Sequence, residues 1–447
     1  MSAGIDLFVR ARHRFACLAV HAVGLFGLDR SAFATFYQVN STADVPDANT
    51  ATAACETAAG NGVCTLRAAV QQANAHAGLD TILLPANTYV LGAVLGVSGS
   101  VTIIGSTAAT TIIDANGAAT GAGAFQLGSA INVSLNHLTI RNGVAGGGIA
   151  SGANLTVDDC IITGNSAESA FGDIHGGGID NSGSLVLKNS IVANNRTLLN
   201  GSTSGIAGGI HSSGPLTISN STISGNQSAY GGGLYAEGKV TITNSTFSGN
   251  SAAYGAAIYS EGATMTLVND TVSGNASAGD GAGMFLDTGT IELYSVTVAA
   301  NEANADNSGG GGGAGIYNFS ASVSLNNSIL SGNYYRSGLF LVQADCAGTF
   351  TSSSNNIVTH PTCTINGPHS SDMPKLGPLQ DNGGPTLTHA LLPGSPAVDA
   401  GGICFDALGA PLGIDQRGVP RPQGAACDLG AFELEDLIFA DDFDPSA

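Results

Sequence analysis

Two columns of side chains carry the residues best suited to chemistry in this sequence. In five successive repeats the residue that follows a Gly-rich tetrad bears a ring, and four of these rings belong to Tyr235, Tyr259, Phe285 and Tyr317. Two positions further along, three repeats carry a carboxylate: Glu237, Glu261 and Asp287. If successive repeats lie one strand spacing apart, about 4.8 Å, the rings stack and the carboxylates stand in line. The pattern predicts either a packing ladder or a platform for sugar rings. The aligned carboxylates would hold a cation such as Ca²⁺, share a proton or spread into water.

A two-part repeat between residues 142 and 333 must position these columns. One part is a tetrad of small residues that ends in an aliphatic residue, as in Gly231-Gly-Gly-Leu234. The other part ends in Asn, as in Phe247-Ser-Gly-Asn250. From the aliphatic residue to the next Asn there are always 16 or 17 residues. From that Asn to the aliphatic residue of the next tetrad there are between 8 and 15 residues. One stretch of the repeat is therefore constant, and all length variation falls at a single corner.

Apolar and polar residues alternate within the constant stretch, as in Leu216-Thr-Ile218-Ser-Asn220, which is typical of short strands. Short strands that recur at this period predict an all-β fold, a right-handed parallel β-helix or solenoid. We expect a small helix-containing N-terminal cap and an irregular C-terminal cap. At one corner we expect a ladder of stacked amides, formed by Asn136, Asn189, Asn220, Asn244, Asn269 and Asn327.

The variable corner is the best candidate for a binding surface. Long segments at 166–175, 196–206 and 302–312 flank short ones at 227–230, 251–254 and 276–280. Insertions on one face of a repeat protein commonly build its binding site. We therefore expect a shallow trough at this corner.

Composition and the N-terminus indicate an exported protein. The chain has 33 acidic and 13 basic residues and a net charge of −20, which argues against nucleic acid and anionic membranes as partners. Arg10, Arg12 and Arg14 precede an apolar run at 15–28, and Ala32-Phe33-Ala34 offers a cleavage site, as in a signal peptide. An ordinary N-terminal helix is the alternative. The run is too short to span a bilayer, and no later stretch has the pattern of a membrane segment, so we expect no transmembrane segment in the mature chain.

Cysteine usage agrees with an oxidising compartment. Three pairs lie close in sequence and predict local disulfides: Cys55 with Cys64, Cys346 with Cys363, and Cys404 with Cys427. Cys160 falls in a column of serines, which predicts a buried free thiol.

The N-terminal region resembles the CSLREA domain of bacterial surface proteins. The resemblance rests on Cys64-Thr-Leu-Arg-Ala-Ala69, with Thr65 and Ala68 departing from the motif, and on the surrounding VNSTAD and DTI-LP-TY patterns. Leu66, Ala69, Val70 and Ala73 mark one face of a short helix, which would cover the open end of the β-helix. We expect Arg67 to have a structural role, such as pairing with a carboxylate or a strand end. The repeats resemble those of chlamydial polymorphic outer-membrane proteins, most closely at 247–258.

The C-terminal region resembles the choice-of-anchor region that accompanies CSLREA domains, through 382–386, 394–399, 415–418 and 427–433. Its polar residues Asp399, Asp415, Arg417 and Arg421 are expected to pin loops rather than to catalyse. Residues 437–443 resemble a terminal tag of exported gammaproteobacterial proteins. The resulting division is a signal peptide at 1–34, an N-terminal cap at 35–91, the β-helix at 92–345, last coils and C-terminal cap at 346–433, and a tail at 434–447.

These observations favour a secreted or outer-surface protein of a Gram-negative bacterium, a monomer that recognises extracellular polysaccharide or a cell-surface component without catalysis. The alternative is a polysaccharide lyase or glycoside hydrolase of the pectin-lyase-like fold, because carboxylates one coil apart approach the separation found in retaining glycosidases. A purely structural surface rod is the third possibility. The sequence assigns no catalytic residue and no cofactor, and the aligned carboxylates are its one candidate for a Ca²⁺ site.

Overall fold

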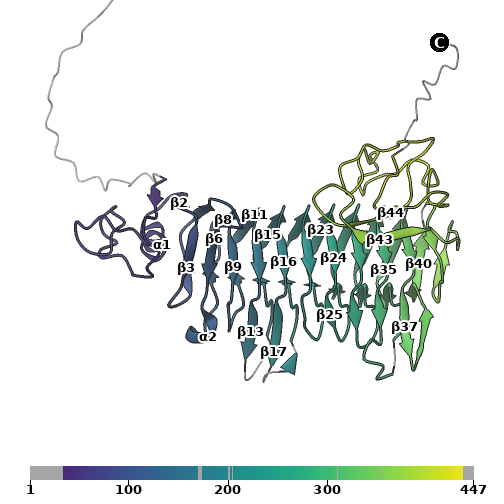
Figure 1. Cartoon of the computed structure of the whole chain (residues 1–447), viewed down its shortest axis with the longest axis horizontal. Coiled ribbons are helices and arrows are strands. Elements are labelled where there is room, and N and C mark those ends of the chain that lie inside the picture. The colour runs from purple at the N-terminus through teal and green to yellow at the C-terminus, as the bar shows by residue number, and fades with distance from the viewer. Residues whose placement is uncertain are drawn as a thin grey trace, which may run out of the picture. The chain divides into compact units, whose positions relative to one another are not determined.

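The structure is a computed structural model that describes residues 34–169, 174–199, 202–203, 205–309, 311–352 and 354–435. The expected signal peptide, apart from Ala34, and the tail beyond residue 435 lie outside these residues. The described part is built almost entirely of short strands that stack in parallel and in register (Figure 1). The predicted parallel β-helix is confirmed.

Three long sheets form the walls of the β-helix. The thirteen-stranded sheet contains β1 Phe36–Gln38, β2 Asp80–Leu84, β5 Val101–Gly105, β8 Asn132–Asn136, β11 Asn154–Asp158, β15 Ser184–Lys188, β20 Leu216–Ser219, β23 Lys239–Thr243, β27 Thr264–Val268, β31 Thr290–Tyr294, β35 Ser322–Asn326, β40 Thr349–Ser352 and β42 Thr364–Asn366. The ten-stranded sheet contains β4 Leu95–Val97, β7 Phe125–Leu127, β10 Ile149–Ser151, β14 Ile179–Asn181, β19 Ile210–Ser212, β22 Leu234–Ala236, β26 Ile258–Ser260, β30 Met284–Leu286, β34 Ile316–Asn318 and β39 Cys346–Ala347. The eleven-stranded sheet contains β3 Asn87–Val90, β6 Thr111–Asp114, β9 Thr139–Arg141, β12 Ile161–Thr163, β16 Ile191–Ala193, β21 Thr222–Ser224, β24 Thr246–Ser248, β28 Thr271–Ser273, β32 Thr297–Ala299, β36 Ile329–Ser331 and β41 Ile357–Val358.

Smaller sheets occupy the variable corner and the C-terminal region. A three-stranded sheet contains β13 Ser166–Ser169, β17 Arg196–Leu199 and β18 Ser202–Thr203, and a five-stranded sheet contains β25 Ser251–Ala252, β29 Ala276–Ser277, β33 Glu302–Ala303, β37 Tyr334–Ser337 and β38 Phe340–Gln343. The hairpin of β43 Leu376–Gln380 and β44 Thr388–Leu391 belongs to the C-terminal region. The stack of coils extends into the segment expected to be the N-terminal cap, because β2 and β3 already pair with β5 and β6.

Alternation along each strand separates the core from the surface. In β23 the side chains of Val240 and Ile242 are buried, while Lys239 points outward and is exposed. Each fully buried aliphatic side chain contributes about 1.5–3 kcal/mol through removal of apolar surface from water. The interior is thus one continuous apolar column, which fixes the register of every coil because a slip of one residue would expose it.

A buried ladder of amides runs along the β-helix at the Asn that ends each repeat. Each side-chain nitrogen donates to the side-chain oxygen of the Asn one coil further on, and the series comprises Asn165, Asn195, Asn226, Asn250, Asn275, Asn301 and Asn333. Asp345 ends the series and accepts from both nitrogens of Asn333. A carboxylate suits this last position, because it accepts hydrogen bonds without requiring an acceptor in a further coil.

The column in which we expected the amide ladder has another role. Asn189, Asn220 and Asn244 adopt positive φ values of 48° to 52° and turn the chain between two sheets. Asn tolerates this left-handed conformation better than most residues. Asn136 does not belong to the column, because it pairs with Asp158 and the turn falls on His137 instead. Among these side chains the coil-to-coil contacts are sparse, such as Asn220 Nδ2 to Asn189 Oδ1 at 3.4 Å.

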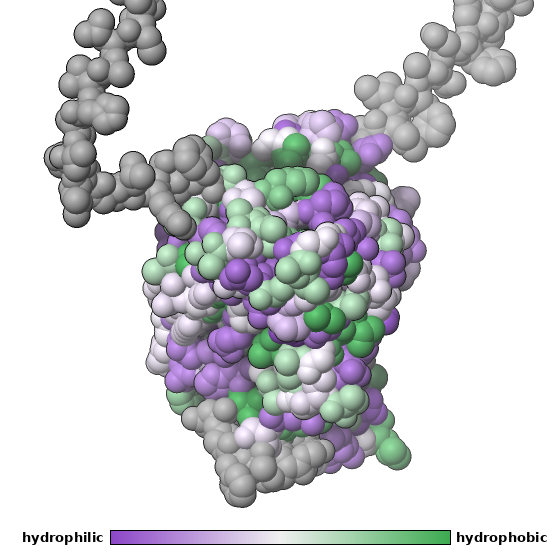
Figure 2. All heavy atoms as spheres, turned by 90° about the vertical axis from the view of Figure 1, so that its left-hand side faces the viewer, coloured by the Kyte–Doolittle hydropathy of each residue, from purple (hydrophilic) through white to green (hydrophobic). Residues whose placement is uncertain are grey.

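Helix α1, Leu66–Ala75, lies at the N-terminal end of the apolar column and buries Leu66, Ala69 and Val70 against it. Arg67 makes a two-pronged ion pair with Asp44 and donates to two backbone carbonyls, which is the structural role that we expected for it. Figure 2, which views this end, shows polar and apolar residues interspersed rather than one large apolar patch. The four-residue helix α2, Gly117–Thr120, is the other helix of the described residues. Neither is long and apolar enough to cross a membrane.

The C-terminal region folds back along the flank of the stack (Figure 1). Gln416 is buried against the eleven-stranded sheet, where it bonds the hydroxyls of Thr246 and Thr271. Arg417 pairs with Asp415, and the buried Arg421 pairs with Glu433. These groups hold irregular loops together, in agreement with their expected structural role. The three predicted disulfides are present, and Cys160 is free and buried.

Candidate functional site on the outer face of the ten-stranded sheet

The predicted ring column lies on the outer face of the ten-stranded sheet. Strands β19, β22, β26, β30 and β34 pair in register, so that His211, Tyr235, Tyr259, Phe285 and Tyr317 are direct neighbours. The ring centroids of Tyr235 and Tyr259 are 4.9 Å apart, those of Tyr259 and Phe285 5.0 Å, and those of Phe285 and Tyr317 5.2 Å. The planes of each pair lie within 10° of parallel. The rings therefore form a continuous stack along the β-helix.

Stacking at this distance limits what the column can bind. Because each ring covers the face of the next, no sugar ring fits between them, and the stack presents ring edges and hydroxyl groups to solvent. Tyr235 is the most enclosed ring and is 5% exposed. Burial, followed by the charge of Asp287, raises the pKa of Tyr259 to about 12, so its hydroxyl stays a hydrogen-bond donor.

A second column that sequence reasoning missed lies beside the first. Tyr230 and Tyr254 directly precede their Gly tetrads, and their rings stack at 5.8 Å. Tyr230 meets Tyr259 edge-on, and Tyr254 meets Phe285 in the same way. Tyr230 is 41% exposed and Tyr254 is 36% exposed, so this column offers more accessible aromatic surface than the predicted one.

The Gly tetrad explains why the two columns meet. Gly231 has φ +64°, and a Cβ atom there would lie 2.5 Å from the carbonyl oxygen of Leu234 and 2.9 Å from the Cβ of Tyr235. Only Gly permits both this conformation and this close approach. The tetrad folds the chain so tightly that the residue before it lies next to the residue after it.

The three predicted carboxylates do not gather into one cluster. Glu237 Oε1 lies 3.3 Å from Nε2 of His211, and Glu261 accepts a hydrogen bond from the hydroxyl of Tyr235. Asp287 lies near enough to Tyr259 to raise its pKa. Each carboxylate thus interacts with the ring of the preceding coil, Glu237 and Glu261 through a direct contact and Asp287 through its charge. The carboxylates remain a prediction as a Ca²⁺ site.

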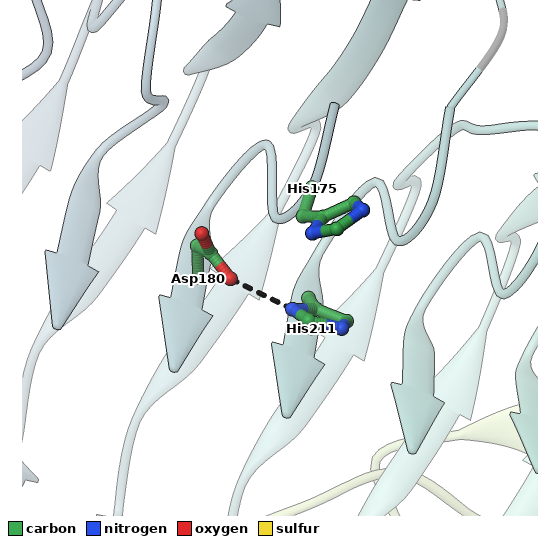
Figure 3. Close-up of side chains that lie close together, drawn as sticks. All are labelled: His175, Asp180 and His211. Carbon is green, nitrogen blue, oxygen red and sulfur yellow. Dashed lines mark hydrogen bonds and ion pairs between the residues drawn. The ribbon is translucent and has the colours of Figure 1, made fainter. Parts of the chain in front are cut away.

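The N-terminal end of the same face is polar. His211 is 5% exposed, its Nδ1 lies 2.7 Å from Asp180 Oδ1, and its ring centroid lies 4.5 Å from that of His175 (Figure 3). Burial of the ring disfavours its charged form, but the hydrogen bonds and charges of Asp180 and Glu237 outweigh this effect and raise the pKa of His211. Asp180 and His211 directly follow their tetrads and so belong to the ring column, whereas His175 directly precedes its tetrad. Sequence reasoning assigned none of the three to a site.

The variable corner holds a groove, as the loop lengths predicted. The groove has a volume of about 350 Å³ and crosses four coils; it is lined by Gln227, Ser228, Ala229, Ser251, Ala252, Ala253, Ala276, Ser277, Ala278, Ala305 and Asp306. In Figure 1 the corner is recessed around β25, between the projections that carry β13 and β17 on one side and β37 on the other. Tyr230 and Tyr254 directly follow the lining residues Ala229 and Ala253. The groove and the aromatic columns therefore adjoin.

Comparison with known proteins bears on the fold. Residues 203–367 match the family described as the right-handed beta helix region. The fold is a right-handed parallel β-helix. The chain is similar to the crystal structure of pectate lyase Pel9A, with a TM-score of 0.50 and 14% sequence identity over 89% of this chain and 96% of that one. No curated protein matches the sequence. At this identity the structural likeness concerns the fold alone.

Proposed function

We propose that this chain is a secreted or cell-surface protein that binds an extracellular polysaccharide without converting it, and that the polymer lies in the groove of the variable corner. The observation that carries the proposal is an open groove across four coils with two exposed tyrosines at its edge. A groove that runs along the stack suits a linear polymer, because successive coils offer the same contacts about 4.8 Å apart. Tyr230 and Tyr254 would contribute apolar edges and hydroxyl groups.

The lining of the groove supports binding rather than catalysis. It consists of Ala and Ser side chains and backbone, with one amide from Gln227 and one carboxylate from Asp306. General acid–base catalysis needs two titratable groups that converge on one bond, and the residues named as lining supply a single carboxylate and no basic side chain.

The charge of the chain restricts the class of polymer. At a net charge of −20, a polyanion is repelled unless a cation bridges it to the protein. We therefore expect a neutral polysaccharide to bind more tightly than polygalacturonate at low ionic strength.

The test compares binding and turnover on a panel of neutral polysaccharides and polygalacturonate, with and without Ca²⁺. Ala253→Tyr fills the groove and Tyr254→Ala removes its edge, and both should abolish binding. Val186→Ala is the matched control, because Val186 is an exposed apolar residue of another sheet. Equal binding by Ala253→Tyr and the unchanged protein would refute the groove as the site.

The alternative is a polysaccharide lyase or glycoside hydrolase, and one observation favours it. His211 and Glu261 stand on the face beside the groove, where an imidazole and carboxylates could act as acid and base. Release of unsaturated products or new reducing ends that disappears in Glu261→Gln would establish this alternative and overturn the non-catalytic proposal.

A further inference from the structure

We propose that His175, Asp180 and His211 bind one transition-metal ion of the zinc class, with Glu237 orienting His211. The proposal is independent of polysaccharide binding in the groove. One ligand atom of each of the three residues lies within 4.8 Å of the others. In Figure 3 the ring of His175 stands over the contact between Asp180 and His211, so that all three side chains face one small space.

The elements that carry these residues are rigid. Asp180 is the central residue of β14 and His211 the central residue of β19, and the two pair directly. His175 forms a backbone bridge with Ile206 one coil further on. Gly176 brings His175 back toward Asp180: its φ is +60°, and a Cβ atom there would lie 2.6 Å from the Cα of Asp180. A site on paired strands of neighbouring coils is pre-organised, which lowers the cost of binding.

The donor set selects the metal. Two imidazoles and one carboxylate suit zinc and its first-row neighbours, whereas Ca²⁺ prefers six to eight oxygen ligands. The nitrogens of His175 accept or donate no hydrogen bond among the described residues, although the ring is only partly exposed and stands beside a carboxylate. An imidazole that has no hydrogen-bond partner in the described part of the chain, and that lies beside a second imidazole and a carboxylate, is arranged for coordination.

Glu237 supplies the outer shell of the site. Its Oε1 lies 3.3 Å from Nε2 of His211, on the opposite side of the ring from Asp180. Metal-binding histidines commonly donate their other N–H to a carboxylate, which fixes the tautomer and the ring orientation. His211 would therefore coordinate through Nδ1 and donate through Nε2.

Coordination requires one small movement. Asp180 Oδ1 and His211 Nδ1 are 2.7 Å apart, and ligand atoms around a tetrahedral zinc ion are about 3.3 Å apart. The side chain of Asp180 is 37% exposed and can rotate, whereas that of His211 is 6% exposed and stays fixed. The ion takes the place of the proton between these two atoms, and that proton goes to solvent. Three protein ligands leave a fourth position for water or for an oxygen of a bound molecule.

The test is titration of the untagged full-length chain, freed of metal, with Zn²⁺ by isothermal calorimetry at pH 7.5. We expect one ion per chain. His175→Ala and Asp180→Asn should each weaken binding more than tenfold, and Glu237→Gln should weaken it about 10- to 100-fold. Excess Ca²⁺ should not compete, because it does not favour imidazole ligands.

The matched control is His137→Ala. His137 lies 2.7 Å from Asp159, the same histidine–carboxylate contact, but both are exposed and neither belongs to the three-residue group. This variant should bind Zn²⁺ as the unchanged protein does. Thermal unfolding provides a second readout: Zn²⁺ should raise the Tm of the unchanged chain and of His137→Ala, but not that of His175→Ala. Failure of the unchanged chain to bind one ion, or equal binding by His175→Ala, would overturn the proposal.

Discussion

Replacing Asn226 by alanine should destabilise the β-helix by about 4 kcal/mol. The side chain of Asn226 is fully buried and takes part in four hydrogen bonds: Nδ2 donates to Val192 O and Asn250 Oδ1, and Oδ1 accepts from both nitrogens of Asn195. A buried hydrogen bond contributes about 1 kcal/mol on average, and four give about 4 kcal/mol. One of these four bonds comes from the buried backbone N–H of Asn195, and because this donor would be left without an acceptor we expect the loss to lie within a range of about 3–5 kcal/mol.

Urea unfolding followed by circular dichroism measures the change, and hydrogen exchange at the Asn195 amide locates it. Asn220→Gly is the control, because Asn220 lies in the same coil at a turn with φ +48°, which Gly adopts without strain. The control should lie within about 0.5 kcal/mol of the unchanged protein. Equal losses in the two variants would refute the assignment of the ladder to the Asn226 column, as would a loss below about 1 kcal/mol for Asn226→Ala.

Burial raises the pKa of Asp270 well above its usual range, although the N–H groups of Ser245 and Val268 oppose the shift. The folded protein thus keeps a proton that the unfolded chain releases above about pH 4. Relative to Asp270→Ser, which restores the serine of neighbouring coils, the stability of the unchanged protein should fall as the pH rises above about 4. Urea midpoints of the two proteins that differ by a constant amount over this pH range would contradict the prediction. Gly231→Ala should lower the unfolding free energy by more than about 1 kcal/mol, and by more than Gly262→Ala, where φ is also positive (+73°) but the nearest atom to a Cβ lies at 3.7 Å. Similar Tm shifts would show that crowding at the tetrad is unimportant. Asp287→Asn should lower the pKa of Tyr259 from about 12, since it removes a nearby negative charge, whereas Asp180→Asn should not; alkaline titration by NMR distinguishes them.

The fold could be predicted because its signal repeats. Alternation in one strand is weak evidence, but the same alternation recurs at a fixed distance from each tetrad, and only stacked coils satisfy all copies at once. The register of the rings at 235, 259 and 285 followed from this period without any knowledge of side-chain packing. The period alone could not decide which Asn column forms the ladder. That choice depends on which column turns inward at its corner, and the column of Asn220 faces outward in a left-handed turn.

The candidate site could be predicted only in part, because it joins two columns that the sequence keeps apart. His175 and Asp180 are five residues apart in the sequence, and this spacing alone does not predict that their side chains meet. They meet His211 because Gly176 reverses the chain without a Cβ atom, and this closeness is a property of the turn rather than of the repeat. The signal that could have revealed the second column was the rings at 230 and 254, each directly before a tetrad.

The tetrad also explains why the fold alone does not predict the function. Its glycines fix how each coil closes, while the residues on either side point outward and bury nothing in the apolar column. A coil can therefore exchange Tyr230 and Tyr235 for His175 and Asp180 at equivalent places without a change to the core. The outward positions beside the tetrad are therefore free to vary without a change of fold. A chain that is similar to a pectate lyase in fold at 14% identity thus shares the constraint on its interior, and the likeness leaves its outward positions unspecified.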